Sequence, residues 1–140
     1  MRCVSLIFVL CALLDGAPIV PDSERIIIND AVERNIKDVA KRKDFVKLLI
    51  AVRRTENGRP GYEFGVEHDD AIGIVKQAGW CAAICWKRWL EYDAGEYHGV
   101  GMQDGDGFVW YLASRYCPVN REVWFSNVVF FILKQEGTDE

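Results

Sequence analysis

Glu56 is the residue of this sequence whose local setting best suits it to proton transfer. It follows an apolar helical run, and the steps Asn57-Gly58 and Pro60-Gly61 turn the chain immediately after it. A carboxyl group at a helix C-terminus meets the negative end of the helix dipole, and partial burial disfavours its charge further. The pattern predicts an acid that holds a proton near neutral pH. The alternative is an ordinary surface glutamate with Arg53 and Arg54 as solvated neighbours.

A second candidate cluster is Glu67-His68-Asp69-Asp70, which places four ionisable side chains together. A metal site is conceivable there, but we expect none, because a helix N-cap by Asp69 or Asp70 is the more economical use of these residues. Either aspartate is also a candidate second carboxylate for glycosidase chemistry, which uses paired carboxyl groups at a defined separation. His98 stands in a glycine-rich stretch that we expect to form a loop. It could titrate near neutrality or bind a ligand, although a lone loop histidine more often does neither.

The segment from Ala51 to Gly58, which contains Glu56, resembles the catalytic-glutamate segment of lysozyme-like lytic transglycosylases and related phage endolysins. Weaker similarity follows in residues 77–84, 108–118 and 124–133, so that the resemblance covers roughly residues 44–133. The family's Gly-Leu-Met-Gln strand is not found after the glutamate. Phe64-Gly65-Val66 stands there, and Gly101-Met102-Gln103 comes much later in the chain.

This resemblance implies a peptidoglycan-cleaving glycosidase, either a lytic transglycosylase or a muramidase, that acts on the β-1,4 bond between amino sugars. Glu56 would serve first as general acid and then as base, and no cofactor is implied. Peptidoglycan glycan strands would be the partner. The substrate-binding residues that the resemblance suggests are Asn57, Tyr62, Phe64, Gln77 and Tyr116, with Tyr111 as the alternative to Tyr116. The aromatic residues among them could instead be core residues, which is the more common role of alternating aromatics such as Tyr62 and Phe64.

The leading alternative is a non-catalytic lysozyme-like module that binds glycan or protein in an envelope complex or a phage particle. The displaced Gly-Met-Gln and the acidic net charge of −4 keep this alternative open. The same charge argues against nucleic acid as a partner, because phosphate binding needs a basic face. The basic run from Lys37 to Lys47 is interrupted by Asp38, Asp44 and apolar residues, and a solvated helical face explains it.

Apolar spacing predicts the elements that must position Glu56. The spacing predicts a mainly α fold with a helical core and a small β-hairpin beside the helix that carries Glu56. The resemblance implies that this fold is of the α+β lysozyme-like kind. The hairpin prediction rests on the alternation from Tyr62 to Glu67. The helices are expected from Pro21 to Arg42, from Phe45 to Thr55 after an Asp44 cap, from Ala71 to Tyr92, from Phe108 to Tyr116, and from an Asn120 cap to a polar tail at Gly137.

The first 17 residues combine a short basic start with an apolar run of eleven residues, Val4 to Leu14, which is too short to span a bilayer. They are interpreted as an export signal, with an uncleaved anchor as the alternative. Residues 18–140 would then form one exported, monomeric domain that meets the membrane only through the signal. Cys3 and Cys11 would leave with the signal. Cys117 would either form a disulfide with Cys81 or Cys85, or all three would be buried thiols.

Overall fold

The computed structural model describes residues 20–96 and 107–137, and these residues form an all-helical unit. The predictions for residues 1–17 and for His98 concern positions outside the described residues. Five α-helices and one 3-10 turn account for the regular structure. They are α1 (Asp22–Asn35), η2 (Val39–Lys41), α2 (Arg42–Glu56), α3 (Ile74–Asp93), α4 (Phe108–Tyr116) and α5 (Arg121–Glu136). The prediction of a mainly helical chain is confirmed for these ranges.

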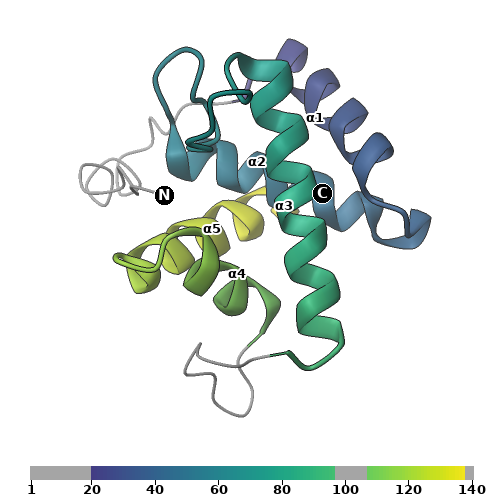
Figure 1. Ribbon diagram of the computed structural model, residues 1–140, viewed down its shortest axis with the longest axis vertical. Coiled ribbons are helices and arrows are strands. Elements are labelled where there is room, and N and C mark those ends of the chain that lie inside the picture. Colours follow the sequence, from purple (N-terminus) through teal and green to yellow (C-terminus); the bar gives the residue numbers. More distant parts are fainter. Residues whose placement is uncertain (1–19, 97–106, 138–140) are drawn as a thin grey trace.

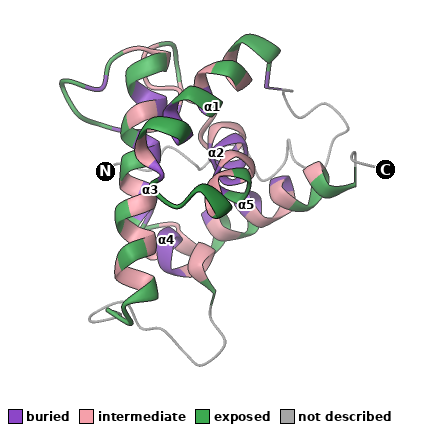
Figure 2. Ribbon diagram, turned by 90° about the vertical axis from the view of Figure 1, so that its right-hand side faces the viewer, coloured by how far each residue is buried: buried purple, intermediate pink, exposed green. Residues whose placement is uncertain are grey.

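Helix α3 is the longest of the described helices; α1, α2 and α4 pack against it, and α5 packs across α2 and α4 (Figure 1). Helix α1 lies on one side of α3 and α4 on the other, while α2 packs against α5. The buried residues face inward from all five helices, as Figure 2 shows by the purple segments on the inner sides of the ribbons. Leu49 and Val52 of α2 are fully buried, so this helix is held inside the bundle and its last residue, Glu56, has a fixed position.

The predicted β-hairpin is wrong, because no strand occurs in the described part of the chain. The segment from Tyr62 to Val66 forms a loop of successive turns. Gly61 and Gly65 have φ values of 94° and 69°, which turn the backbone away from an extended path. The backbone groups of this loop find side-chain partners instead of a neighbouring strand. Alternation of apolar and polar residues therefore gave the wrong structure here.

Two predicted helix starts differ from the structure, and the first helix ends at Asn35 and not at Arg42. Helix α2 begins at Arg42, which places Asp44 inside its first turn and not at the cap. Helix α3 begins at Ile74 after Gly73, so neither Asp69 nor Asp70 caps it, and the predicted start at Ala71 is too early. Asn120 does stand at the N-cap of α5, but its side chain makes no capping hydrogen bond. Asp69 and Asp70 instead form a turn, in which the Ala71 N–H donates to the His68 carbonyl at 2.9 Å, and Gly73 before α3 has a positive φ of 96°.

The cysteines follow neither predicted arrangement completely. Cys117 is disulfide-bonded, whereas Cys81 and Cys85 are free and fully buried in α3. The predicted disulfide between Cys117 and either α3 cysteine is therefore wrong, and so is the prediction of three buried thiols.

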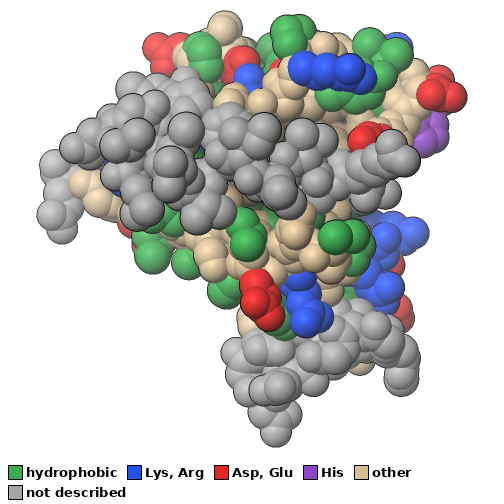
Figure 3. All heavy atoms as spheres, turned by 90° about the vertical axis from the view of Figure 1, so that its left-hand side faces the viewer, with side chains coloured by type: hydrophobic (Ala, Val, Ile, Leu, Met, Phe, Trp, Pro, Cys, Tyr) green, Lys and Arg blue, Asp and Glu red, His purple; other side chains and the backbone are tan. Residues whose placement is uncertain are grey.

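On the face drawn in Figure 3, acidic and basic side chains of the described residues gather in small separate groups among hydrophobic ones. Among the described helices, none offers an apolar stretch of the length that crossing a bilayer requires.

Candidate functional site

Glu56 is the last residue of α2, and its carboxyl group is held by an indole from the far end of the chain. The Trp124 Nε1–H in α5 donates a hydrogen bond of 2.6 Å to Glu56 Oε1. Asn57 directly after it adopts a left-handed conformation with φ 39° and closes the helix through its N–H on the Arg53 carbonyl at 3.0 Å. This combination ends the helix sharply and leaves the carboxyl group directed at α5.

Burial raises the pKa of Glu56 from its ordinary 4.5 to about 7, and the hydrogen bond from Trp124 acts in the opposite direction because it favours the charged form. Burial is the larger of the two effects. At neutral pH the side chain is therefore divided between its protonated and its charged form. This agrees with the raised pKa that the sequence pattern predicts, and it is the condition under which a carboxyl group can both give and take a proton.

The loop after Glu56 folds back onto the carboxyl group, and two glycines permit this. A Cβ atom added to Gly65 would overlap Oε2 and Cδ of Glu56, so only a residue without a side chain can lie there. A Cβ atom on Gly58 would likewise overlap the carbonyl oxygen of Tyr62. Gly65 also has a positive φ, which glycine adopts without strain. Oε1 of Glu56 thus faces the indole, and Oε2 lies against the loop backbone.

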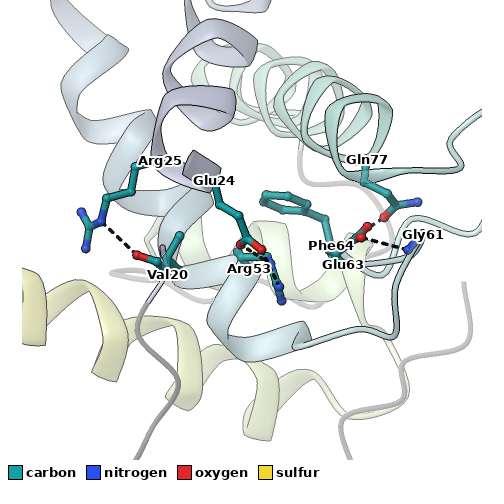
Figure 4. Close-up of polar contacts among 8 residues, drawn as sticks. All are labelled: Val20, Glu24, Arg25, Arg53, Gly61, Glu63, Phe64 and Gln77. Atoms are coloured by element: carbon teal, nitrogen blue, oxygen red, sulfur yellow. Dashed lines mark hydrogen bonds and ion pairs between the residues drawn. The ribbon is translucent and has the colours of Figure 1, made fainter. Parts of the chain in front are cut away.

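Gln77 of α3 holds this loop in place through all of its polar atoms. Its Oε1 accepts hydrogen bonds from the backbone N–H groups of Phe64 and Val66, both at 3.2 Å. Its Nε2 donates to the carbonyls of Val66 at 2.7 Å and Ala71 at 2.5 Å. Figure 4 shows Gln77 reaching from its helix toward the loop beside Phe64. The side chain is fully buried, so Gln77 supports the site from behind and is not placed to contact a ligand.

Tyr116 of α4 supports the same loop from another direction. Its hydroxyl donates a hydrogen bond of 2.5 Å to the Phe64 carbonyl, and its ring stacks on Trp124 with centroids 5.2 Å apart. Burial raises the pKa of the Tyr116 hydroxyl well above its ordinary value, so it remains a neutral donor. The structure thus brings Tyr116 to the Glu56 site, as the sequence suggested, in contact with Trp124 and the loop. Tyr111, the alternative, instead donates to Glu91 at 2.9 Å.

The other predicted site residues lie in different environments. Phe64 is fully buried in the core, whereas Tyr62 is partly exposed with the Arg59 guanidinium 4.6 Å from its ring centroid. Asp69 and Asp70 are both exposed, and Asp70 lies 3.9 Å from His68, which stacks on Trp80. No group of three or more His, Cys, Asp or Glu side chains in residues 20–96 and 107–137 has the arrangement of a metal site.

Trp124 is the residue of this site that the sequence did not identify as a partner of Glu56. The sequence shows it only as one apolar position on the last helix, 68 residues beyond Glu56. Its indole N–H supplies a hydrogen-bond donor that a phenylalanine at this position would lack. Comparisons of the chain with known protein families, with curated proteins and with solved structures find no match. Function must therefore be argued from this arrangement of groups.

Proposed function

We propose that this protein is a peptidoglycan-cleaving glycosidase in which Glu56 is the single acid/base group. The observation that carries the proposal is the partly buried carboxyl group with a pKa of about 7, held between an indole N–H and a glycine backbone. A general acid in glycoside cleavage must keep its proton near neutral pH and release it to a glycosidic oxygen, and burial is the usual means of achieving this. The resemblance of the Glu56 segment to lytic transglycosylases supplies the substrate class.

The two oxygens of Glu56 would then have different tasks. Oε1 accepts the Trp124 hydrogen bond, so the proton of the neutral acid belongs on Oε2. Transfer of that proton to the glycosidic oxygen breaks the bond to the anomeric carbon and leaves a carboxylate. The indole N–H already points at this carboxylate and stabilises its charge, as a hydrogen bond to an ionised acceptor does. Trp124 therefore assists the step that burial alone would oppose.

The second half of the reaction would use the same group as a base. By the resemblance, the acetamido oxygen of the substrate attacks the anomeric carbon as the bond breaks. The Glu56 carboxylate then removes a proton from the incoming hydroxyl, whose oxygen bonds to the anomeric carbon as the acetamido oxygen leaves it. The hydroxyl belongs to water in a hydrolase or to the same sugar in a lytic transglycosylase. This route needs no second carboxylate near Glu56, and the exposed positions of Asp69 and Asp70 are compatible with it.

A second function, binding without catalysis, is favoured by the state of the predicted substrate contacts. Phe64, Gln77 and Tyr116 are buried, and the polar groups of Gln77 and Tyr116 are bonded to the protein itself. Of the five predicted contacts, only Asn57 and Tyr62 retain partial exposure. A site with so few open contacts is also what a lysozyme-like domain without activity would have.

Mass spectrometry of the fragments released from purified peptidoglycan by the full chain separates these functions. The comparison uses wild type, Glu56→Gln and the control Glu122→Gln, which alters an exposed glutamate on α5. Anhydro-muropeptides that disappear only with Glu56→Gln would establish a lytic transglycosylase, and reducing-end products a muramidase. Release that survives Glu56→Gln would refute Glu56 as the acid. Glycan binding without release by any of the three proteins would establish the binding module.

A further inference from the structure

A cavity of about 380 Å³ lies at the other half of α2, away from Glu56. It is formed between α1 and residues 42–50 of α2, and Gln135 of α5 also lines it. Its volume falls in the lower part of the range of about 300–1,000 Å³ that small-molecule sites occupy. Because the nearest lining residue on α2, Ile50, is six residues from Glu56, roughly 9 Å of helix separates the two places.

The charges around this cavity are opposite to those of the whole chain. Four cationic side chains line it, Arg25, Arg42, Lys43 and Lys47, and Glu33 is the only carboxylate among the lining residues. The chain as a whole has a net charge of −4. The interrupted basic run that the sequence presents as a solvated face therefore meets Arg25 of another helix and becomes a positive hollow.

Backbone hydrogen bonds hold Arg25 and Arg42 through their Nε atoms and leave their Nη groups available to a ligand. Arg25 Nε donates to the Val20 carbonyl at 3.3 Å, and Arg42 Nε donates to the Ile36 carbonyl at 3.1 Å. Figure 4 shows the Arg25 side chain extended away from the neighbouring Glu24–Arg53 ion pair. Within residues 20–96 and 107–137, no acceptor is bonded to the Nη groups of either arginine, and Lys43 has no carboxylate partner.

This positive charge is costly unless an anion compensates it. Arg42 and Lys43 stand in the first turn of α2, where the positive end of the helix dipole disfavours cations. The charge of Arg25 also acts on Arg54, whose pKa is lowered by burial and by that neighbouring guanidinium. An oxyanion in the cavity would offset both repulsions, and the free Nη edges suit a planar or tetrahedral group with several oxygens.

We propose that the cavity between α1 and α2 is a binding site for an oxyanion, a phosphate or carboxylate group, held by Arg25, Arg42 and Lys43. The site does not depend on the activity proposed for Glu56, since it uses none of the same side chains. Phosphate and carboxylate share the chemistry that these residues recognise, namely several negatively charged oxygens within reach of guanidinium N–H donors. The test must therefore present both.

The test is an NMR titration of the full chain, in which backbone amide shifts are followed with inorganic phosphate, with citrate and with sodium chloride at matched ionic strength. Saturable shifts confined to α1 and the start of α2 with phosphate or citrate, but not with chloride, support the site, and the stronger of the two identifies the group. Absence of saturation with both oxyanions in the tens-of-millimolar range overturns it.

Two variants and one control decide whether the shifts come from this cavity. Lys43→Gln removes an exposed, unpaired charge and should weaken oxyanion binding about tenfold, the loss of one charge-assisted contact. Arg42→Lys keeps the charge but loses the planar fork and should also weaken it. Lys76→Gln removes the same charge from an exposed position on α3 and should leave the affinity for the oxyanion unchanged. Equal weakening by Lys43→Gln and Lys76→Gln would show only general attraction and would overturn the proposal.

Discussion

Replacing Glu56 by glutamine should stabilise the fold at alkaline pH and not at acidic pH. The pKa of Glu56 is about 7 in the folded state against an ordinary 4.5, so the folded state binds more protons than the unfolded state between these two values. Because stability rises with pH only where the unfolded state binds more protons, this residue makes the free energy of unfolding fall as pH rises from 4.5 to 7. Below pH 4.5 the penalty is absent, and above pH 7 it is complete.

The size of the penalty follows from the pKa difference. A difference of roughly 2.5 pKa units at 1.36 kcal/mol each gives about 3 kcal/mol as an upper figure. Glutamine occupies the same volume, carries no charge and can still accept the Trp124 hydrogen bond through its Oε1. The Glu56→Gln variant therefore keeps the contact with Trp124 and has no group at this position that titrates. Its advantage over wild type should grow from near zero at pH 4 to about 3 kcal/mol at pH 8.

Urea unfolding of wild type, Glu56→Gln and the control Glu122→Gln across this pH range measures the effect. Other titrating groups contribute equally to wild type and variant, so they cancel in the difference between the two curves. Glu122→Gln should show a difference that does not change with pH in this way. A flat difference for Glu56→Gln, or one that falls with rising pH, would refute the assignment of a raised pKa to this carboxyl group.

Three further substitutions test the surroundings of Glu56. Trp124→Phe removes a donor to the carboxylate, worth roughly 1.5 kcal/mol or more, and should raise the Glu56 pKa by about one unit in a ¹³C NMR titration; an unchanged pKa would argue against the bond. Gly65→Ala should reduce both glycan cleavage and stability, because its Cβ would overlap the Glu56 carboxyl group and its backbone has a positive φ; normal activity in the release assay would contradict this packing. Gln77→Leu leaves four loop backbone groups without their partner and should cost on the order of 4 kcal/mol in urea unfolding, and a cost below about 1 kcal/mol would contradict the role of Gln77.

The sequence predicts the helices well because their apolar positions recur at three and four residues over long segments. It fails between Tyr62 and Val66, where alternation indicates a strand. There the glycines at positions 61 and 65 and the side chain of Gln77 determine the backbone path. Helical periodicity is a property of one segment, but the course of this loop depends on a residue of the next helix. Local pattern carries no information about that contact.

For the candidate site, too, the sequence predicts the features that depend on neighbouring residues and misses the contacts between distant helices. The helix end, the turn after it and the raised pKa of Glu56 could be predicted, since neighbouring residues determine the first two and partial burial of a helix-terminal carboxyl group suggests the third. The pairing of Glu56 with Trp124 could not, because it joins two helices that are far apart in the chain. Likewise, Gln77 and Tyr116 were expected to contact substrate, and their polar groups are instead bonded to the loop beside Glu56.

The loop beside Glu56 is held by side chains of other helices, so the pKa of Glu56 depends on how the helices of the bundle pack together. The carboxyl group comes from α2, its hydrogen-bond donor from α5, and the side chains that hold the loop against it from α3 and α4. A compact state that retained its helices but lost their packing would admit water to all of these contacts. Glu56 would then titrate like any exposed glutamate, and the proton needed at neutral pH would be gone while the helical content was still intact.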